Sequence, residues 1–159
     1  MIKQRTKREL LEVRTKPEFD QKLVDLSRVT RVVAGGKRLR FRACVLIGNY
    51  QGQVGYGIAK GADVAIAVEK AVRQAKKQII NVPIVDETIP YSIRQKYKAA
   101  KILLKPAAKG KGIIAGGAMR IVLVLSGVKN ATGKILGSRN KINNVKAIFE
   151  AFKKLKNIK

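Results

Sequence analysis

The sequence predicts an α+β protein of two small domains. The first would have the order helix, three strands, helix, and the second would be a small α/β sandwich. Three observations predict this. Apolar residues alternate with arginines over 38–47, which is the side-chain period of a strand. Apolar stripes at helical spacing recur over 62–80 and 141–155. Pro83 falls between them, so we place residues 18–83 and 84–159 in separate domains.

The N-terminal segments lead into a hairpin. Residues 1–17 are polar and basic, and we interpret them as an arm. Residues 18–27 place apolar side chains at helical spacing, which predicts a short helix. Val29 to Val33 is the first predicted strand. The paired glycines within 34–37 favour a tight turn, because they supply the positive φ that a hairpin needs.

The second predicted strand, residues 38–47, has two different faces. Leu39, Phe41, Ala43, Val45 and Ile47 would share the buried face, and Arg38, Arg40 and Arg42 would share the outer one. Cys44 continues the arginine row, and we expect it to be a small packing residue.

In the third strand, Gly55 and Gly57 would let a neighbouring backbone approach. The helix over 62–80 would bury Val64, Val68, Ala71, Val72, Ala75 and Ile79.

The second domain is expected to begin with a hairpin of strands 88–93 and 99–105. A basic glycine loop, 106–112, would precede a buried helix within 113–126, which Gly127 would end. A strand over 128–136 and a final helix capped by Asn140 complete the chain. That helix would bury an apolar face with Lys146 and Lys153 turned away.

Charge points to a polyanionic partner. The chain of 159 residues has 35 Lys and Arg against 10 Asp and Glu, a formal charge of +25. From Thr88 onward there are 17 basic residues and a single acidic one, Glu150. Such an excess destabilises a compact monomer by self-repulsion, and a nucleic acid would relieve it. An anionic membrane is the weaker candidate, and no apolar run approaches the ~20 residues needed to span one.

The sequence lacks the residues that catalysis, metal binding or nucleotide binding would need. There is no His and only one Cys, so the common general base, an internal disulfide and a cysteine-rich zinc site are excluded. The nearest Walker A candidate, 127–134, has one residue too many and Ile135 where Ser or Thr should hold magnesium. Two Gly-x-Gly stretches have the third glycine of a dinucleotide fingerprint one position late. We therefore expect no catalytic residue, metal, cofactor or small-molecule substrate.

Basic residues beside glycines and on the arginine row are the candidate RNA contacts. Glycine lets backbone N–H groups reach a phosphate while lysine supplies charge. Aromatic residues are scarce at 5%, so recognition of folded RNA by phosphate and shape fits better than base stacking. The expected contacts are Arg28, Arg31, Gly35, Gly36, Lys37, Arg38, Arg40, Arg42, Lys60, Lys105, Lys109, Lys111, Lys129, Lys134, Ser138, Arg139 and Asn140.

Four segments in order, GGKRLRFRA, QVGYGIAKGADV, KPAAKGKGIIAGGAMRIVL and GSRN, carry a resemblance to one family. Over about residues 25–155 the chain resembles small-subunit ribosomal protein S-five of bacterial or organellar type, whose first domain is double-stranded-RNA-binding-like. The resemblance implies a structural constituent of the small subunit, in a cytoplasmic or organellar ribosome. It would bind ribosomal RNA at the head–body junction, near the path by which messenger RNA enters.

The resemblance also implies partners and a role in accuracy. Ribosomal proteins S-four and S-eight are the expected protein partners. Gly112, Gly116, Gly117 and Arg120 match the face towards S-four that affects decoding. Residues 29–37 match the loop that sets spectinomycin sensitivity, although Ala34 stands where many members have Lys. Ala59 stands where a glycine is common in the family.

Two other functions compete with this interpretation. A free-standing double-stranded-RNA-binding regulator would need the first domain alone, which leaves the basic second half unexplained. An ATP-using enzyme would be suggested by the second domain's fold, which the family shares with some kinases. It would need acidic magnesium ligands, and after Glu87 the chain has only Glu150.

Overall fold

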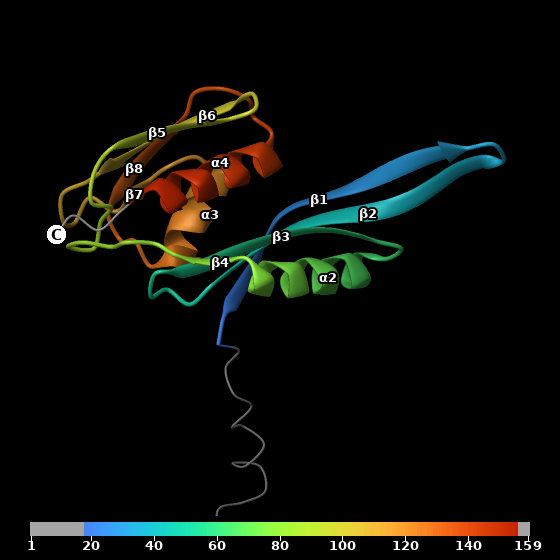
Figure 1. The fold of residues 1–159 in the computed structure, drawn as a ribbon, viewed down its shortest axis with the longest axis horizontal. Helices are drawn as coiled ribbons and strands as arrows, with labels where there is room; N and C mark the ends of the chain where they lie inside the picture. Colours follow the sequence, from blue (N-terminus) through green and yellow to red (C-terminus); the bar gives the residue numbers. More distant parts are fainter. Residues whose placement is uncertain (1–17, 156–159) are drawn as a thin grey trace, which may run out of the picture.

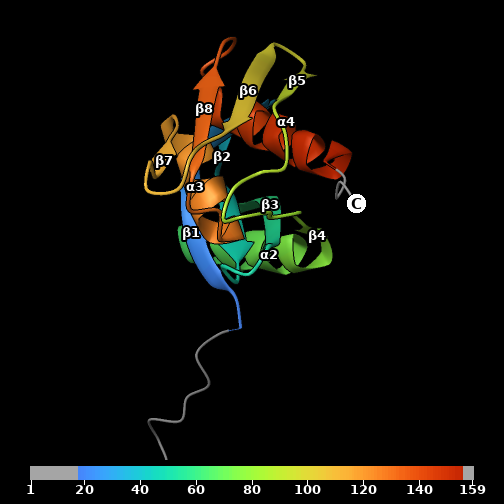
Figure 2. The same ribbon diagram turned by 90° about the vertical axis from the view of Figure 1, so that its left-hand side faces the viewer.

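The computed structural model describes residues 18–155, which form two stacked α/β units (Figures 1 and 2). From one side to the other, the layers are the second sheet, helices α3 and α4, the first sheet, and helix α2. The first unit contains β1 Asp20–Val33, β2 Gly36–Gly48, β3 Gln53–Gly61, α2 Val64–Lys77 and β4 Ile79–Asn81, with sheet order β1-β2-β3-β4. The second contains β5 Ile93–Tyr97, β6 Ala100–Pro106, β7 Ile113–Ile114, α3 Gly117–Ser126, β8 Ala131–Ile135 and α4 Lys141–Lys154, with sheet order β5-β6-β8-β7.

The α+β class and the two domains agree with the prediction, but the helix over 18–27 is wrong. Those residues form the start of β1, which pairs antiparallel with β2 from Asp20↔Gly48 to Val33↔Gly36. A bulge between Leu23 and Asp25 inserts Val24, which is buried. The apolar spacing suited a helix, but β2 offers a partner along its whole length. The basic arm of 1–17 lies outside the described residues.

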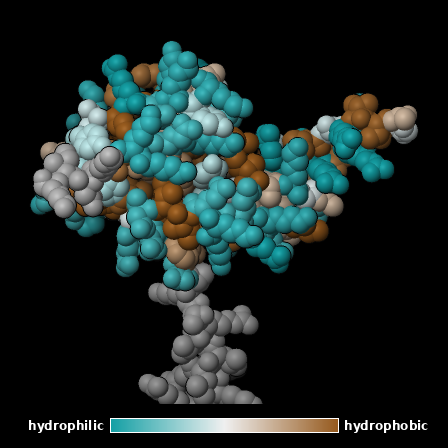
Figure 3. Space-filling model, in the orientation of Figure 1, coloured by the Kyte–Doolittle hydropathy of each residue, from teal (hydrophilic) through white to brown (hydrophobic). Residues whose placement is uncertain are grey.

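The hairpin of β1 and β2 projects well beyond the rest of the sheet (Figure 1). Its tip therefore lacks the helix that covers its base. Leu39, expected on the buried face, is 51% exposed, and Val32 is 75% exposed. In Figure 3 the outer part of the projection shows brown, hydrophobic residues among teal, hydrophilic ones. The predicted apolar face of β2 is buried only from Ala43 inwards, and Phe41 is half-buried.

Helix α2 packs on the first sheet through small residues. A Cβ added to Gly57 would lie 1.9 Å from the carbonyl oxygen of Ala71, and one added to Gly55 would lie 2.5 Å from that of Ala75. The predicted close approach of backbone is thus confirmed. Ala67, which the predicted stripe omitted, is buried with Ala71 and Ala75.

Helix α2 is shorter than predicted at both ends. It begins after its N-cap Asp63 and ends at Lys77, so the extension to residue 80 is wrong. Ile79 to Asn81 instead pair with β3 as a fourth strand. The edge of β3 supplies the hydrogen-bond partners that a further helical turn would have lost near Pro83.

The opposite face of the first sheet is covered by the second domain. Cys44 and Leu46, on the arginine side of β2, belong to one core cluster with Met119 and Phe149. The prediction of a single buried face is therefore wrong for this half of the strand. Cys44 is fully buried, which confirms its packing role. The rings of Tyr56 and Phe149 meet edge to face across the boundary, with centroids 4.6 Å apart.

Capping confirms two predicted helix boundaries in the second domain. Gly127 ends α3 in the left-handed region at φ 86°, and its N–H bonds to Leu123 and Val124 carbonyls. The Asn140 side chain accepts a hydrogen bond from the Asn143 N–H and caps α4. The buried apolar face of α4 is also as predicted. Lys146, predicted to turn away, is instead half-buried beside the Tyr97 ring.

The strands of the second domain begin later than predicted. The first runs from Ile93 to Tyr97 rather than over 88–93, because Pro90 removes a donor from the earlier segment. The strand predicted over 128–136 is limited to Ala131–Ile135. Within residues 18–155, no helix is long and apolar enough to cross a membrane.

Candidate nucleic-acid interface

Five basic side chains gather on the face of the first sheet beyond the second domain. Strand register puts Arg31 opposite Arg38, and Arg42 opposite Lys60. Arg40 stands between Arg38 and Arg42 on the same face, because side chains alternate along a strand. We call this set the hairpin groove: Arg31, Arg38, Arg40, Arg42 and Lys60. A hollow of about 260 Å³ is lined by four of these residues, all except Arg42, and the residues that line it include no acid.

Unopposed cations make this groove costly in the free protein. Arg31 and Arg38 are direct cross-strand neighbours, and like charges in that relation destabilise a sheet. The three residues Arg31, Arg38 and Arg40 are exposed, so their charges are available to a partner. A phosphate is a strong partner for arginine, whose planar fork of donors matches two of its oxygens.

The groove continues towards α4 beside Arg42. A second hollow, of about 370 Å³, lies between Arg42, Tyr56, Gln74 and Lys146 among others. Arg42 is half-buried, and its Nε is buried without a hydrogen-bond acceptor in the described chain. A buried donor without a partner costs free energy, which an incoming acceptor would recover. The sequence did not identify Lys146 here, because its place depends on how the two domains pack.

The remaining predicted residues of the hairpin lie elsewhere. Arg28 pairs with Phe41 and Lys37 with Val32, which places both basic residues on the face opposite the groove. Gly35 and Gly36 form the tip, where Gly36 has a φ of 134°. The hairpin therefore presents arginines on one face and a mixture of basic and apolar residues on the other.

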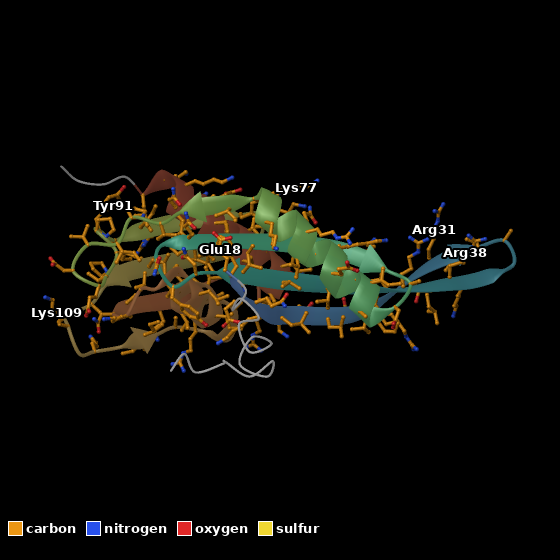
Figure 4. The ribbon with its side chains drawn as sticks, turned by 90° about the horizontal axis from the view of Figure 1, so that it is seen from below. Glu18, Arg31, Arg38, Lys77, Tyr91 and Lys109 are labelled. Carbon is orange, nitrogen blue, oxygen red and sulfur yellow. The ribbon has the colours of Figure 1, made fainter. Side chains whose placement is uncertain are left out.

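The basic glycine loop lies at the far end of the molecule from the hairpin. Figure 4 shows Lys109 at one extreme and Arg31 and Arg38 near the other. Lys109 and Lys111 are exposed, and the glycines beside them, Gly110 and Gly112, have φ of 85° and 72°. The structure thus separates the predicted RNA contacts into distinct surfaces rather than bringing them into one.

Several predicted contacts have partners inside the chain. Lys129 forms an ion pair with Glu87, and this contact lowers the pKa of the Glu87 carboxyl. The Ser138 hydroxyl accepts a hydrogen bond from the Asn140 N–H, 3.1 Å away, and Asn140 itself caps α4. These groups shape the loop before α4, and Arg139 between them is exposed.

Lys105 and Lys134 lie on the outer face of the second sheet. The register also brings Arg94, Lys96 and Lys101 to that face. The sequence interpretation did not select these three residues. Their alternation with apolar residues in IRQKY and AKILLKP was the signal that could have found them.

The predicted protein-partner residues lie around β7 and the first turn of α3. Gly117 has no atom within 4 Å of an added Cβ, so the start of α3 is open. The Gly112 N–H donates to the Asn130 side chain, and the guanidinium of Arg120 donates to the Ile113 carbonyl at 3.2 Å. The backbone of Gly116 accepts from the Arg120 N–H.

The chemistry of Cys44 is that of an inert core thiol. Burial raises its pKa from 9.0 to about 11, so the thiolate is scarce at neutral pH. Among residues 18–155, no group of three acidic or cysteine side chains could hold a metal ion.

Comparison with known proteins gives matches along both domains. The sequence model described as "Ribosomal protein S5, N-terminal domain" matches residues 19–83, and that of "Ribosomal protein S5, C-terminal domain" matches residues 95–159. Small ribosomal subunit protein uS5c of Rhodomonas salina is 48% identical over 140 residues, which is 87% of this chain and 83% of that protein. Small ribosomal subunit protein uS5 of Synechococcus elongatus is 49% identical over 140 residues, 87% of this chain and 78% of that protein.

Proposed function

The chain belongs to the ribosomal protein S5 family, and from this premise we propose that it is a structural constituent of the small ribosomal subunit that binds ribosomal RNA. It acts by charge and geometry rather than by catalysis. Cations held on two packed domains neutralise phosphates where RNA segments meet, and the rigid scaffold fixes the relative position of those segments.

The hairpin groove is the observation that carries this proposal. It places Arg38 and Arg40 side by side on one exposed face, with Lys60 beside Arg42 on the next strand. No acidic residue lines the hollow over the groove, so a polyanion is the partner that relieves the repulsion between its cations. No aromatic side chain lines the hollow over the groove, which favours contact with phosphates over stacking of bases.

The location in the subunit and the protein partners are proposed from membership of the family. We propose that the hairpin reaches the head–body junction of the small subunit, close to where messenger RNA enters, and that the protein contributes to decoding accuracy. The corner of Gly112, Gly116, Gly117 and Arg120 would face protein S-four, and protein S-eight would be the second protein partner. Its place is the ribosome, of a bacterial cytoplasm or of a plastid, because the relatives include both types. We also propose that the two domains comprise residues 18–83 and 84–159.

The salt dependence of RNA binding tests the groove. The variant Arg38→Gln/Arg40→Gln/Lys60→Gln removes three phosphate partners from the full chain. With each contact contributing ~0.7–0.9 to the log–log salt slope, the slope for binding small-subunit ribosomal RNA should become shallower by about 2–3. The matched control, Lys70→Gln/Lys76→Gln/Lys77→Gln, removes three exposed charges of α2 and should leave the slope unchanged.

Two results would contradict the proposal. One is an equal slope for the groove variant and the unchanged protein. The other concerns sedimentation: a free-standing RNA-binding regulator would not travel stoichiometrically with small subunits after a salt wash, whereas a structural constituent stays with them.

A further inference from the structure

The second sheet is covered on one face and bare on the other. Helices α3 and α4 lie against the side that carries Ile102 and Leu104, both fully buried. In Figures 1 and 2 the opposite side of this sheet forms the outer boundary of the described chain, and no other element lies over it. A bare sheet face of this kind is open to a partner.

Strand register places basic side chains along the bare face. Arg94 of β5 lies opposite Leu103 of β6, which lies opposite Lys134 of β8. Lys96 lies opposite Lys101, and Lys105 follows four residues further along β6 on the same face. All the basic residues named here are exposed. We call them the outer sheet face: Arg94, Lys96, Lys101, Lys105 and Lys134.

This arrangement carries a cost in the free protein. Lys96 and Lys101 are direct cross-strand neighbours, with Cβ atoms expected ~4.5–5.5 Å apart, and like charges so placed are destabilising. The strands β5, β6, β7 and β8 contain no acidic residue that could offset this repulsion. Glu150, on α4, accepts a hydrogen bond from Gln95, which alternates with Arg94 and Lys96 and so points to the covered side.

We propose that the outer sheet face is a second RNA-binding surface, which holds the phosphate backbone of a helical RNA segment distinct from the one in the hairpin groove. This inference rests on the proposed function, because it assumes that RNA is the polyanion. The two surfaces are separated by the layer of α3 and α4 (Figure 2). A chain with both would tie two RNA segments together at a fixed separation.

The dimensions and composition of the face favour a duplex backbone. Lys101 and Lys105 are separated by about 13 Å along β6, at ~3.3 Å per residue. The strands on either side add Arg94 and Lys134 at ~4.8 Å spacing, so the cations form a plane rather than a pocket. Tyr97, the aromatic residue of these strands, is paired with the buried Ala100 and lies beside Lys146 of α4. A base therefore has no ring to stack on at the bare face, whereas duplex RNA offers phosphates.

Neutralising this face tests the inference. The full-length variant Lys96→Gln/Lys101→Gln/Lys134→Gln is compared with the unchanged protein for binding to a duplex RNA of two helical turns and to small-subunit ribosomal RNA. Loss of three phosphate contacts should make the salt slope shallower by about 2–3 and weaken binding about 100-fold at 0.15 M salt. The α2 control, Lys70→Gln/Lys76→Gln/Lys77→Gln, should change neither quantity. Thermal melts establish that each variant is folded.

A lysine footprint supplies a second readout on the unchanged protein. In complex with ribosomal RNA, Lys96, Lys101 and Lys134 should be protected from acetylation, and Lys70 and Lys77 should remain reactive. Protection that appears with small-subunit proteins but not with RNA would identify a protein partner and overturn the inference.

The outcomes separate this inference from the proposed function. If the groove variant loses affinity for ribosomal RNA but the outer-face variant does not, the second surface is refuted and the proposed function stands. If the unchanged protein fails to bind ribosomal RNA, both are refuted.

Discussion

Replacement of Gly57 by alanine tests how the first sheet is held against α2. An alanine Cβ there would lie 1.9 Å from the carbonyl oxygen of Ala71 and 2.8 Å from the Ala75 nitrogen. Both neighbours are backbone atoms inside a helix, so no side-chain rotation can relieve the overlap. An ordinary contact would be near 3.4 Å, so α2 would have to move away from β3 by more than an ångström.

The size of the effect follows from that displacement. Overpacking a well-packed core typically costs 1–3 kcal/mol, and a clash with rigid backbone belongs at the upper end, about 3 kcal/mol. For a chain of this length the melting temperature should fall by roughly 6–12 °C. Because α2 also covers the base of the hairpin, the variant should bind RNA more weakly when it is partly unfolded, and normally when it is fully folded at low temperature.

Thermal and urea unfolding would measure the change. Gly35→Ala is the matched control, because an added Cβ at Gly35 meets nothing within 4 Å, and it should be neutral or stabilising by up to about 1 kcal/mol. The double variant Gly57→Ala/Ala71→Gly should not be rescued, since the clash is with the carbonyl of residue 71 rather than its methyl group. A Gly57→Ala protein as stable as the Gly35→Ala protein would refute the packing argument.

Three further predictions concern single groups. Cys44 should not react with a disulfide reagent at pH 8 until the chain is unfolded. Because its folded pKa is raised to about 11, Cys44 should contribute to the free energy of unfolding below pH 9, and roughly 2–3 kcal/mol of that contribution should be lost as the pH rises from 9 to 11. Asn140→Ala should lower the free energy of unfolding by about 1 kcal/mol in urea titration, since it removes the cap of α4, whereas Asn140→Asp should retain most of it. Tyr50→Phe should raise the pKa of Asp20 towards its ordinary value in an NMR titration, because the Tyr50 hydroxyl donates to that carboxylate at 2.5 Å; an unmoved Asp20 titration would show that the hydrogen bond is absent.

Local chemistry made several elements predictable from the sequence. Gly127 and Asn140 mark helix ends because the left-handed φ and the side-chain cap depend on one residue each. Gly55 and Gly57 marked a close approach because only glycine leaves space for another backbone. These features depend on a few neighbouring atoms, which a sequence pattern records.

Elements that depend on distant partners were harder to predict. Residues 20–27 carry a helical spacing, yet they form strand because β2 supplies partners that lie 15 to 28 residues further along the chain. Similarly, Ile79 to Asn81 leave the helix because the edge of β3 is free to pair. The candidate site shows the same limit. The arginine row was visible in the sequence, whereas the gathering of Arg31 and Lys60 beside it required the register of two hairpins.

Burial decreases along one face of β2, and this links the packing of the two domains to the position of the groove. On that face, Leu46 and Cys44 are buried under the second domain, Arg42 is half-buried at its margin, and Arg40 and Arg38 are exposed beyond it. The same strand therefore serves as core at one end and as cationic surface at the other. Because Arg42 stands at the transition, any shift of the second domain changes the wall of the groove. Asp25 of β1, bonded to Lys141 of α4 at 3.2 Å, spans the same margin. At its Arg42 end the groove borders residues of the hydrophobic core, so we expect that end to keep a fixed shape for the RNA that we propose it binds.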